Sequence, residues 1–243
     1  MGALSNRIHV GTSGWHYAHW KGKFYPARLP SDEFLRFYAS HLPVVELNNT
    51  FYRLPEENAV AHWRDETPRD FRFAVKGSRF LTHMKKLKDP AQGLERFFSR
   101  IDALRPKIGP ILFQLPPHWT VDEERLRNFL HALPKRHRYS FEFRDPSWNT
   151  NGVLQLLADF KAAYCIFDLA GFQSPCTLTT DFTYIRLHGP GARYQGSYEK
   201  SVLRAWVARV RKWNLCSSYV FFDNDQAAYA VKNAIHFREL LES

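Results

Sequence analysis

Two carboxylates in strand-like segments are the residues best placed to do chemistry. Glu142 precedes Arg144 by two positions, and Glu46 precedes Asn48 in the same way, each within a run of β-branched and aromatic residues. Side chains two positions apart on a strand share one face, so each acid has a polar companion. Such a Glu–Arg pair can serve proton transfer or can be a structural ion pair. We predict Glu142 and Glu46 to be catalytic, with Arg144 and Asn48 binding the substrate.

A third run ends in Arg186 and His188, which also share a face, and Gly189 follows at once. Glycines allow backbone N–H groups to approach an anion, and the loop after the seventh strand of a barrel is a frequent phosphate site. We therefore predict His188 to be catalytic and Arg186 and Gly189 to bind the substrate. The alternative is a flexible turn with the histidine packed beneath it.

Four further residues end or follow strand-like runs and are predicted to bind the substrate. Lys76 can bind phosphate or carboxylate or, if desolvated, act as a nucleophile or base, and its alternative role is to pair with one of the two glutamates. Gln114 lies near the end of its run. Trp15 and Tyr52 follow the first two runs and can stack on a sugar or base, although a packed lid over the site is the more common role for such aromatics.

Asp168 and Asp223 also end strand-like runs and are the candidate metal ligands. Carboxylates of this kind, with a histidine nearby, can hold a divalent metal ion. No H-x-H or H-E-x-x-H spacing supports the assignment. A divalent metal is thus a possible cofactor, and the cofactor is otherwise unknown.

These polar residues need a scaffold that brings the ends of many strands together. Eight strand-like runs alternate with helical ones, and the helical patterns cover 31–42, 55–66, 92–104, 122–133, 151–160, 198–213 and 225–241. The strand-like runs are 8–13, 44–48, 71–76, 111–115, 139–144, 164–168, 184–188 and 219–224. This order predicts an α/β fold, a single TIM-type (β/α)₈ barrel over 1–243, whose strand ends form one mouth. Residues 170–180 lack a helical period, so the sixth crossover is expected to be short or irregular.

Composition is that of a soluble, basic protein. The 243 residues carry a net charge of +10, which favours anionic partners such as nucleic acid or phosphorylated metabolites, or serves solubility alone. Three scattered cysteines indicate neither a disulfide framework nor a zinc ribbon. No apolar run approaches the ~20 residues of a membrane span and the first residues lack a signal peptide. We expect a cytoplasmic protein without a membrane partner.

Seven stretches, in order along almost the whole chain, resemble those of the domain-of-unknown-function 72 family, the YecE-like proteins. They are Gly11–Trp15, Glu46–Tyr52, Val75–Lys76 with Thr82–His83, Leu112–Pro116, Glu142–Trp148, Arg186–Gly189 and Phe221–Asp225. The resemblance implies a TIM-type barrel and no particular reaction. One departure is visible, because Phe222-Asp223-Asn224 stands where the family usually reads Phe-Asn-Asn. An acid in place of an amide changes the charge at the rim.

Three functions fit these features. The first is an enzyme acting on an anionic, phosphate-containing substrate; one version is hydrolysis of the phosphodiester bonds of nucleic acid, which normally requires metal ions. The second is a metal-free enzyme acting on carbohydrate through Glu46 and Glu142. The third is a nucleic-acid-binding protein without catalysis, held by phosphate contacts that salt weakens steeply.

Overall fold

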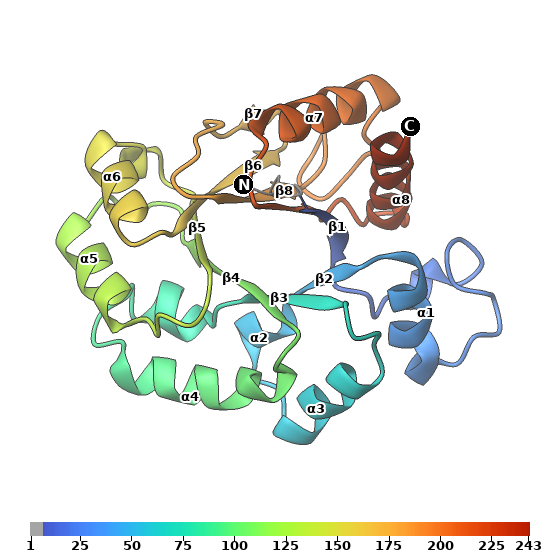
Figure 1. Cartoon of the computed structure of the whole chain (residues 1–243), viewed down its shortest axis with the longest axis horizontal. Helices are drawn as coiled ribbons and strands as arrows, with labels where there is room; N and C mark the ends of the chain where they lie inside the picture. The colour runs from blue at the N-terminus through green and yellow to red at the C-terminus, as the bar shows by residue number, and fades with distance from the viewer. Residues whose placement is uncertain (1–6) are drawn as a thin grey trace, which may run out of the picture.

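Eight parallel strands close into a barrel that helices surround (Figure 1). The computed structural model describes residues 7–243, and within them the barrel order is β1–β2–β3–β4–β5–β6–β8–β9, with β9 hydrogen-bonded back to β1. The strands are β1 (Arg7–Ser13), β2 (Val44–Leu47), β3 (Arg72–Lys76), β4 (Ile108–Leu115), β5 (Tyr139–Phe143), β6 (Ala163–Leu169), β8 (Phe182–Leu187) and β9 (Ser217–Phe222). The predicted TIM-type barrel is confirmed.

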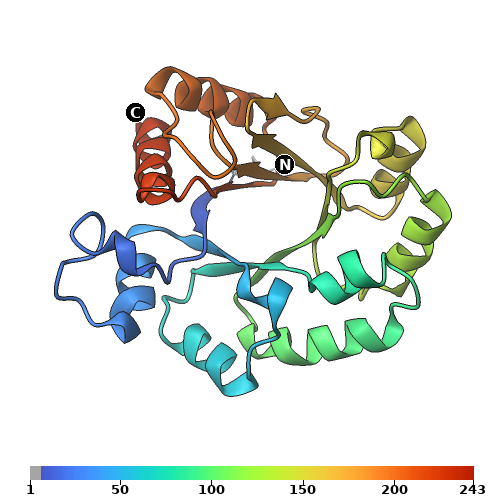
Figure 2. The same ribbon diagram turned by 180° about the vertical axis from the view of Figure 1, so that it is seen from behind.

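The helices lie outside the barrel, as the same ring seen from behind also shows (Figure 2). They are α1 (Phe34–His41), α2 (Asn49–Tyr52), α3 (Glu57–Asp65), α4 (Ala91–Ile101), α5 (Glu123–Ala132), α6 (Asn151–Asp159), α7 (Lys200–Trp213) and α8 (Tyr229–Glu242). The crossover between β6 and β8 has no helix; the chain turns back there as the short antiparallel strand β7 (Phe172–Gln173). The irregular sixth crossover is therefore confirmed. No helix within residues 7–243 is long and apolar enough to cross a membrane.

Strand β4 begins three residues before the predicted run. Ile108 pairs with Phe73, but Ile111 pairs with Val75, so β4 holds one extra residue and the register shifts between these pairs. Pro110 lies in the irregular segment, where its missing N–H removes no regular ladder bond. The proline hid this first part of the strand from the sequence pattern.

Period-two alternation divides the strand residues between two cores. Side chains such as Ile166 and Leu187 pack outward against the helices in the main core. A smaller cluster fills the barrel interior, and its members are Val44, Ala74, Leu112, Ala163, Cys165, Phe182, Tyr184, Tyr219 and Phe221. Small residues such as Ala74 and Ala163 on the interior face leave room for long polar side chains above them. The inner core therefore lies directly beneath the polar side chains at the strand ends.

Candidate functional site

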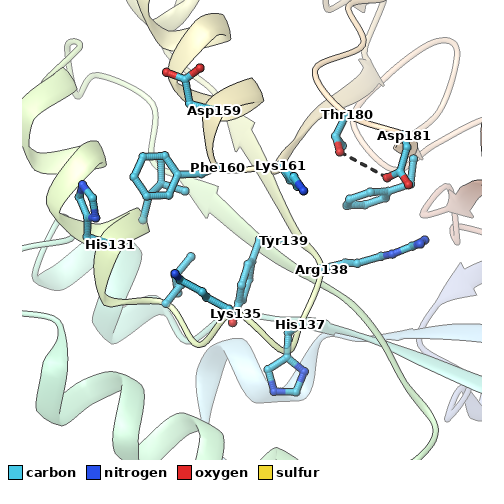
Figure 3. Close-up of a pocket in the computed structure, with 13 residues that line it drawn as sticks. His131, Lys135, His137, Arg138, Tyr139, Asp159, Phe160, Lys161, Thr180 and Asp181 are labelled. Atoms are coloured by element: carbon cyan, nitrogen blue, oxygen red, sulfur yellow. Dashed lines mark hydrogen bonds between the residues drawn. The ribbon is translucent and has the colours of Figure 1, made fainter.

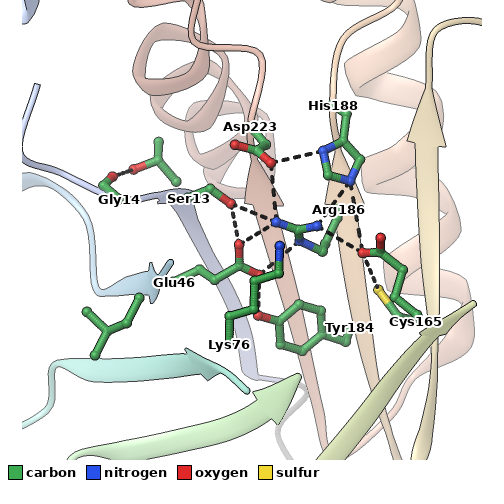
Figure 4. Close-up of polar contacts among 12 residues, drawn as sticks. Ser13, Gly14, Glu46, Lys76, Cys165, Tyr184, Arg186, His188 and Asp223 are labelled. Carbon is green, nitrogen blue, oxygen red and sulfur yellow. Dashed lines mark hydrogen bonds and ion pairs between the residues drawn. The ribbon is translucent and has the colours of Figure 1, made fainter. Parts of the chain in front are cut away.

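A buried arginine from β8 lies at the centre of the barrel mouth and binds three carboxylates (Figure 4). The Nε and Nη2 atoms of Arg186 donate to Glu46 at 3.0 and 2.7 Å, and Nη1 donates to Glu142 at 2.9 Å. Nη2 also donates to Asp223 at 3.2 Å. Burial opposes the charge on this guanidinium, but the carboxylates outweigh burial and raise the pKa of Arg186. The arginine thus stays charged and ties β2, β5 and β8 together across the barrel.

Both carboxylate oxygens of Glu46 accept hydrogen bonds from neighbouring side chains. Its carboxylate is fully buried, and besides Arg186 it accepts hydrogen bonds from the hydroxyl of Tyr184 at 2.6 Å and from the hydroxyl of Ser13. Charge-assisted bonds of this kind are stronger than neutral ones. Glu46 is therefore held as a charged acceptor.

Glu142 is held in the same way. One of its oxygens accepts from Nε of Arg144, and the other accepts from Arg186 and lies 3.7 Å from the thiol of Cys165. Burial alone would raise the pKa of Glu142, but Arg144 and Arg186 hold it well below its usual range. Glu142 is consequently ionised and enclosed by donors.

The contacts of His188 assign its tautomer. Nε2 lies 3.0 Å from Nη2 of Arg144 and 3.3 Å from Nη1 of Arg186, and a guanidinium only donates, so Nε2 accepts. Nδ1 lies 2.9 Å from Asp223 and therefore carries the proton. Burial and then the charge of Arg186 lower the pKa of His188, so the ring is neutral.

Asp223 is the member of the cluster that also faces the pocket at the mouth. Burial would raise the pKa of Asp223, but the hydrogen bond from His188 and the charge of Arg186 lower it. Both of these contacts use Oδ2, and among residues 7–243 no side-chain donor contacts Oδ1. Asp223 therefore presents a charged oxygen to whatever enters the pocket.

Lys76 enters the same pocket from the end of β3. Its Nζ lies 4.3 Å from the ring centroid of Phe51, and within the described chain it has no carboxylate at ion-pair distance. Burial and then the charge of Arg186 lower its pKa to about 8, although nearby carboxylates partly offset the effect. Lys76 is thus a mostly buried amine that titrates close to neutral pH.

The pocket has a volume of about 530 Å³ and lies over the C-terminal ends of the strands. Its lining is Tyr17, Asn48, Tyr52, Lys76, Arg193, Tyr194, Gln195, Asp223, Asp225 and Gln226. Oδ1 of Asn48 is buried there and has no hydrogen-bond partner among residues 7–243. Burial raises the pKa of Asp225 to about 6, even though Trp20 donates to it at 2.7 Å. The pocket therefore offers one unsatisfied acceptor and groups that titrate on either side of neutral pH.

Seven of the predicted residues converge on this cluster or its pocket wall. They are Glu46, Glu142, Arg144, Arg186, His188, Asp223 and Lys76. Asn48 and Tyr52 join them in the pocket lining, and Tyr52 is 70% exposed at its rim. The geometry brings these residues together, and their chemical roles stay predictions.

Trp15 does not reach the mouth. Its side chain is buried in the outer core, and its ring packs edge-on against Trp63 of α3 with centroids 5.4 Å apart. The prediction that Trp15 binds the substrate is not supported by this position, because the turn after β1 directs the ring to the helical layer. The packing role that such aromatics more often play is the one observed.

Asp168 also lies away from the cluster. It is in register with Leu187, and Ile166 on the same face of β6 belongs to the outer core. Burial raises the pKa of its carboxylate, and the nearby hydroxyl of Tyr198 partly offsets this effect. Asp168 and Asp223 therefore have different partners, and residues 7–243 contain no group of three His, Cys, Asp or Glu side chains arranged to hold a metal ion. The predicted metal pair has no structural support at the mouth.

Gln114 and Gly189 occupy the predicted places but make other contacts. Gln114 is in register with Glu142, yet its amide contacts only the carbonyl of Leu115, at 3.5 Å, among the described residues. Gly189 has φ +117°, and its N–H donates to the hydroxyl of Tyr198 at 2.9 Å. The N–H expected to bind an anion is therefore already used within the protein.

Several residues of the site were not predicted from the sequence. Tyr184 and Cys165 share the interior face with predicted residues, so alternation could have found them. Tyr194 packs its ring 5.5 Å from that of His188, and Asp225 follows the last strand by three residues. Loop residues such as these carry no periodic signal.

Comparison with known proteins places the chain in a family. The family described as "Protein of unknown function DUF72" matches residues 9–243. The chain belongs to the DUF72 family. The protein YecE of Escherichia coli K12 is 33% identical over 146 residues, which cover 60% of this DUF72 chain and 51%, or about half, of that relative's length. The protein YunF of Bacillus subtilis is 26% identical over 97% of this chain and 95% of its own.

Solved structures of the DUF72 family share the barrel. A crystal structure from Thermotoga maritima is 29% identical, with a TM-score of 0.90 over 98% of this chain and 100% of that one. A second, from Enterococcus faecalis, is 21% identical, with a TM-score of 0.83 over 97% of this chain and 96% of its own, and shows the fold alone. None of these descriptions names a substrate or an activity.

Proposed function

We propose that this protein is an enzyme that binds a small anionic, phosphate-containing substrate in the mouth pocket and transfers a proton there. The observation that carries the proposal is Lys76, a mostly buried amine that faces the pocket without a carboxylate at ion-pair distance in the described chain. A desolvated, unpaired cation is costly unless it is used. A phosphate or carboxylate group of a substrate would supply the missing counter-charge.

The pocket walls suit a small polar molecule. Arg193 adds a second cation, and the unsatisfied Oδ1 of Asn48 can accept a hydrogen bond from a substrate hydroxyl or amine. Ligand pockets typically enclose about 300–1,000 Å³, and this one falls in that range. Tyr17, Tyr52 and Tyr194 supply aromatic surface for the apolar part of the ligand.

The proton transfer would use two groups of the pocket lining. Asp225 has a pKa raised to about 6 and Lys76 a pKa lowered to about 8. Titratable groups whose environments move their pKa values toward neutrality are suited to be general acids and bases near pH 7. Asp223, kept ionised by His188, would hold and orient the substrate beside them.

The buried glutamates then act as positioning residues. A sugar-cleaving pair needs one acid protonated near neutral pH, whereas the pKa of Glu142 is held low and Glu46 is enclosed by four donors. These contacts argue against the carbohydrate alternative. They favour a role in which Glu46 and Glu142 fix Arg186, and through it Asp223 and His188, beneath the pocket.

The test is a binding screen of phosphorylated metabolites by ligand-detected NMR, with each dephosphorylated compound as its pair. We expect a phosphorylated ligand to bind and its dephosphorylated pair to fail. Lys76→Met should weaken binding about 10–100-fold, since hydrogen bonds to charged groups contribute about 1.5–3 kcal/mol. The matched control is Lys88→Met, an exposed lysine outside the pocket lining. Equal affinity of Lys76→Met and wild type would refute the assignment.

A second variant separates binding from catalysis. Asp225→Asn removes a titrating group but keeps the side chain's size, so the ligand should still bind while turnover of the identified substrate falls. Loss of binding with unchanged turnover per bound substrate would instead make Asp225 a substrate-binding residue.

A further inference from the structure

The end of the barrel opposite the mouth gathers three arginines that have no carboxylate partner in the described chain. Arg7 opens β1, Arg72 opens β3, and Arg138 lies immediately before β5. Within residues 7–243, the guanidinium groups of Arg72 and Arg138 donate only to neutral oxygens, namely backbone carbonyls and a serine hydroxyl. By contrast, Arg144 and Arg186 at the mouth are paired with carboxylates.

Arg138 reaches across this end of the barrel. Its Nη1 donates to Oγ of Ser217 at 2.6 Å, and Ser217 opens β9 in register with Arg7 of β1. Its guanidinium also lies 5.3 Å from the ring centroid of Phe182 at the start of β8. Arg138 therefore brings its charge from β5 to the side of the barrel where Arg7 begins.

His9 and Tyr219 form a stacked pair among the three arginines. Their ring centroids are 4.7 Å apart at an interplanar angle of 12°. Burial and then the charges of Arg72, Arg7 and Arg138 lower the pKa of His9 to about 4. The same three charges act on Tyr219, whose pKa burial raises. The charges of all three arginines thus act on the same stacked pair, and the low pKa of His9 leaves that ring neutral at pH 7.

A groove of about 660 Å³ begins beside Arg138 (Figure 3). Lys135 and Lys161 line it, and Phe160, Tyr139 and Phe182 give it aromatic walls. Two acids, Asp159 and Asp181, line it as well, and Asp181 immediately precedes Phe182, the ring that the guanidinium of Arg138 faces. The groove offers ring-sized apolar surface next to an uncompensated cationic cluster.

We propose that this end of the barrel is a second ligand site, which binds a phosphorylated molecule of nucleotide size. Its phosphate groups would contact Arg7, Arg72 and Arg138, and its ring system would lie in the groove. Like charges held together repel one another, and a polyanion removes this cost while forming bidentate bonds that suit guanidinium groups. The mouth cannot account for the chain's net charge of +10, because four carboxylates there balance four cations. These eight are Glu46, Glu142, Asp223, Asp225, Lys76, Arg144, Arg186 and Arg193.

The experiment measures binding of ATP and of inorganic pyrophosphate to the full chain by calorimetry at low salt. The double variant Arg72→Gln/Arg138→Gln should weaken both by more than about tenfold, in keeping with two lost charge-assisted contacts. The charge-matched control is Arg127→Gln/Arg204→Gln, on the exposed faces of α5 and α7. Because Arg138 also bonds Ser217, the single variant Arg7→Gln at an exposed position checks the site without disturbing that contact.

Each outcome decides the proposal. Loss in the arginine variants alone, with Lys76→Met unchanged, supports a site at this end of the barrel. Equal loss in the control pair shows that the charge is diffuse, and loss in Lys76→Met shows that the probes bind at the mouth; either result overturns the proposal, as does the absence of binding to both probes. A short oligonucleotide tests whether the phosphate belongs to nucleic acid. If the double variant no longer binds the oligonucleotide, the site is assigned to nucleic acid. If the double variant still binds it, that assignment is overturned.

Discussion

Replacement of Arg186 by methionine removes the one side chain that three carboxylates share. Glu46 and Glu142 are fully buried, so their charges would remain inside the protein without this partner. Removing one member of a buried ion pair costs about 3–5 kcal/mol. In the variant, the hydroxyl of Tyr184 still donates a hydrogen bond to Glu46, and Arg144 still pairs with Glu142. We therefore expect a loss of about 4 kcal/mol in the free energy of unfolding at pH 7.

The pH dependence of this loss gives the sharper test. In the wild type the pKa of Glu142 is below its value in the unfolded chain, about 4.3, so its stabilising contribution is complete above that pH and is lost as pH falls through the folded-state pKa. Without Arg186, burial is offset less and the folded-state pKa of Glu142 rises. As pH falls from neutrality, Glu142 of the variant takes up a proton and no longer has to be buried as an unpaired charge. The difference between the two proteins in free energy of unfolding therefore becomes smaller.

Urea unfolding followed by circular dichroism at pH 7 and at pH 5 measures both effects. Arg100→Met is the control, since its pair with Glu56 is exposed and lies at 3.5 Å. Such surface pairs contribute about 0–1 kcal/mol, and the control should show no narrowing with pH. A loss below about 1 kcal/mol for Arg186→Met, or a gap that widens on acidification, would refute the description of the cluster.

Three further outcomes follow from the geometry. Lys76, labelled by reductive ¹³C-methylation, should titrate near pH 8 in the folded protein by NMR, and a value near 10 would contradict its burial. ¹⁵N NMR of His188 should show the proton on Nδ1 and a neutral ring at pH 7, whereas a doubly protonated ring would contradict the contacts with the two arginines. Gly189→Ala should destabilise the fold by about 1–3 kcal/mol, because its φ is +117° and a Cβ would lie 2.2 Å from a backbone oxygen; thermal unfolding should show Gly191→Ala, with nothing within 4 Å, to be nearly neutral.

Much of the site could be predicted because strand alternation is a strong constraint. Because side chains two positions apart share a face, an inward-facing Glu142 requires Arg144 to face inward as well. The same spacing puts Arg186 and His188 on one face. Parallel strands in a closed barrel then bring these ends together whatever their separation along the chain. The barrel and its irregular crossover followed from the same alternation and from the glycine and proline after β6.

The failures have equally local causes. Asp168 ends its strand, but Cys165 occupies the interior face of β6, so the aspartate faces the helices. Trp15 follows Gly14, which has φ +85°, and the direction of the chain after such a turn is not encoded in any period. The sequence also could not predict the carboxylate partners of Arg186, because they depend on how far side chains extend across the closed barrel.

The contacts of Arg186 have a consequence for how the chain folds. Glu46 lies 140 positions before its arginine, and β2 and β8 are not neighbours in the barrel. The loop that must close before this bond forms is long, and contacts of such high sequence separation form late. Until the last strands arrive, Glu46 needs water around it, so the centre of the barrel stays hydrated through most of folding. The water then leaves in the same late step in which Arg186 reaches Glu46. An N-terminal half of this barrel would keep Ser13 but lack Tyr184 and Arg186, so Glu46 would depend on water for its remaining hydrogen bonds.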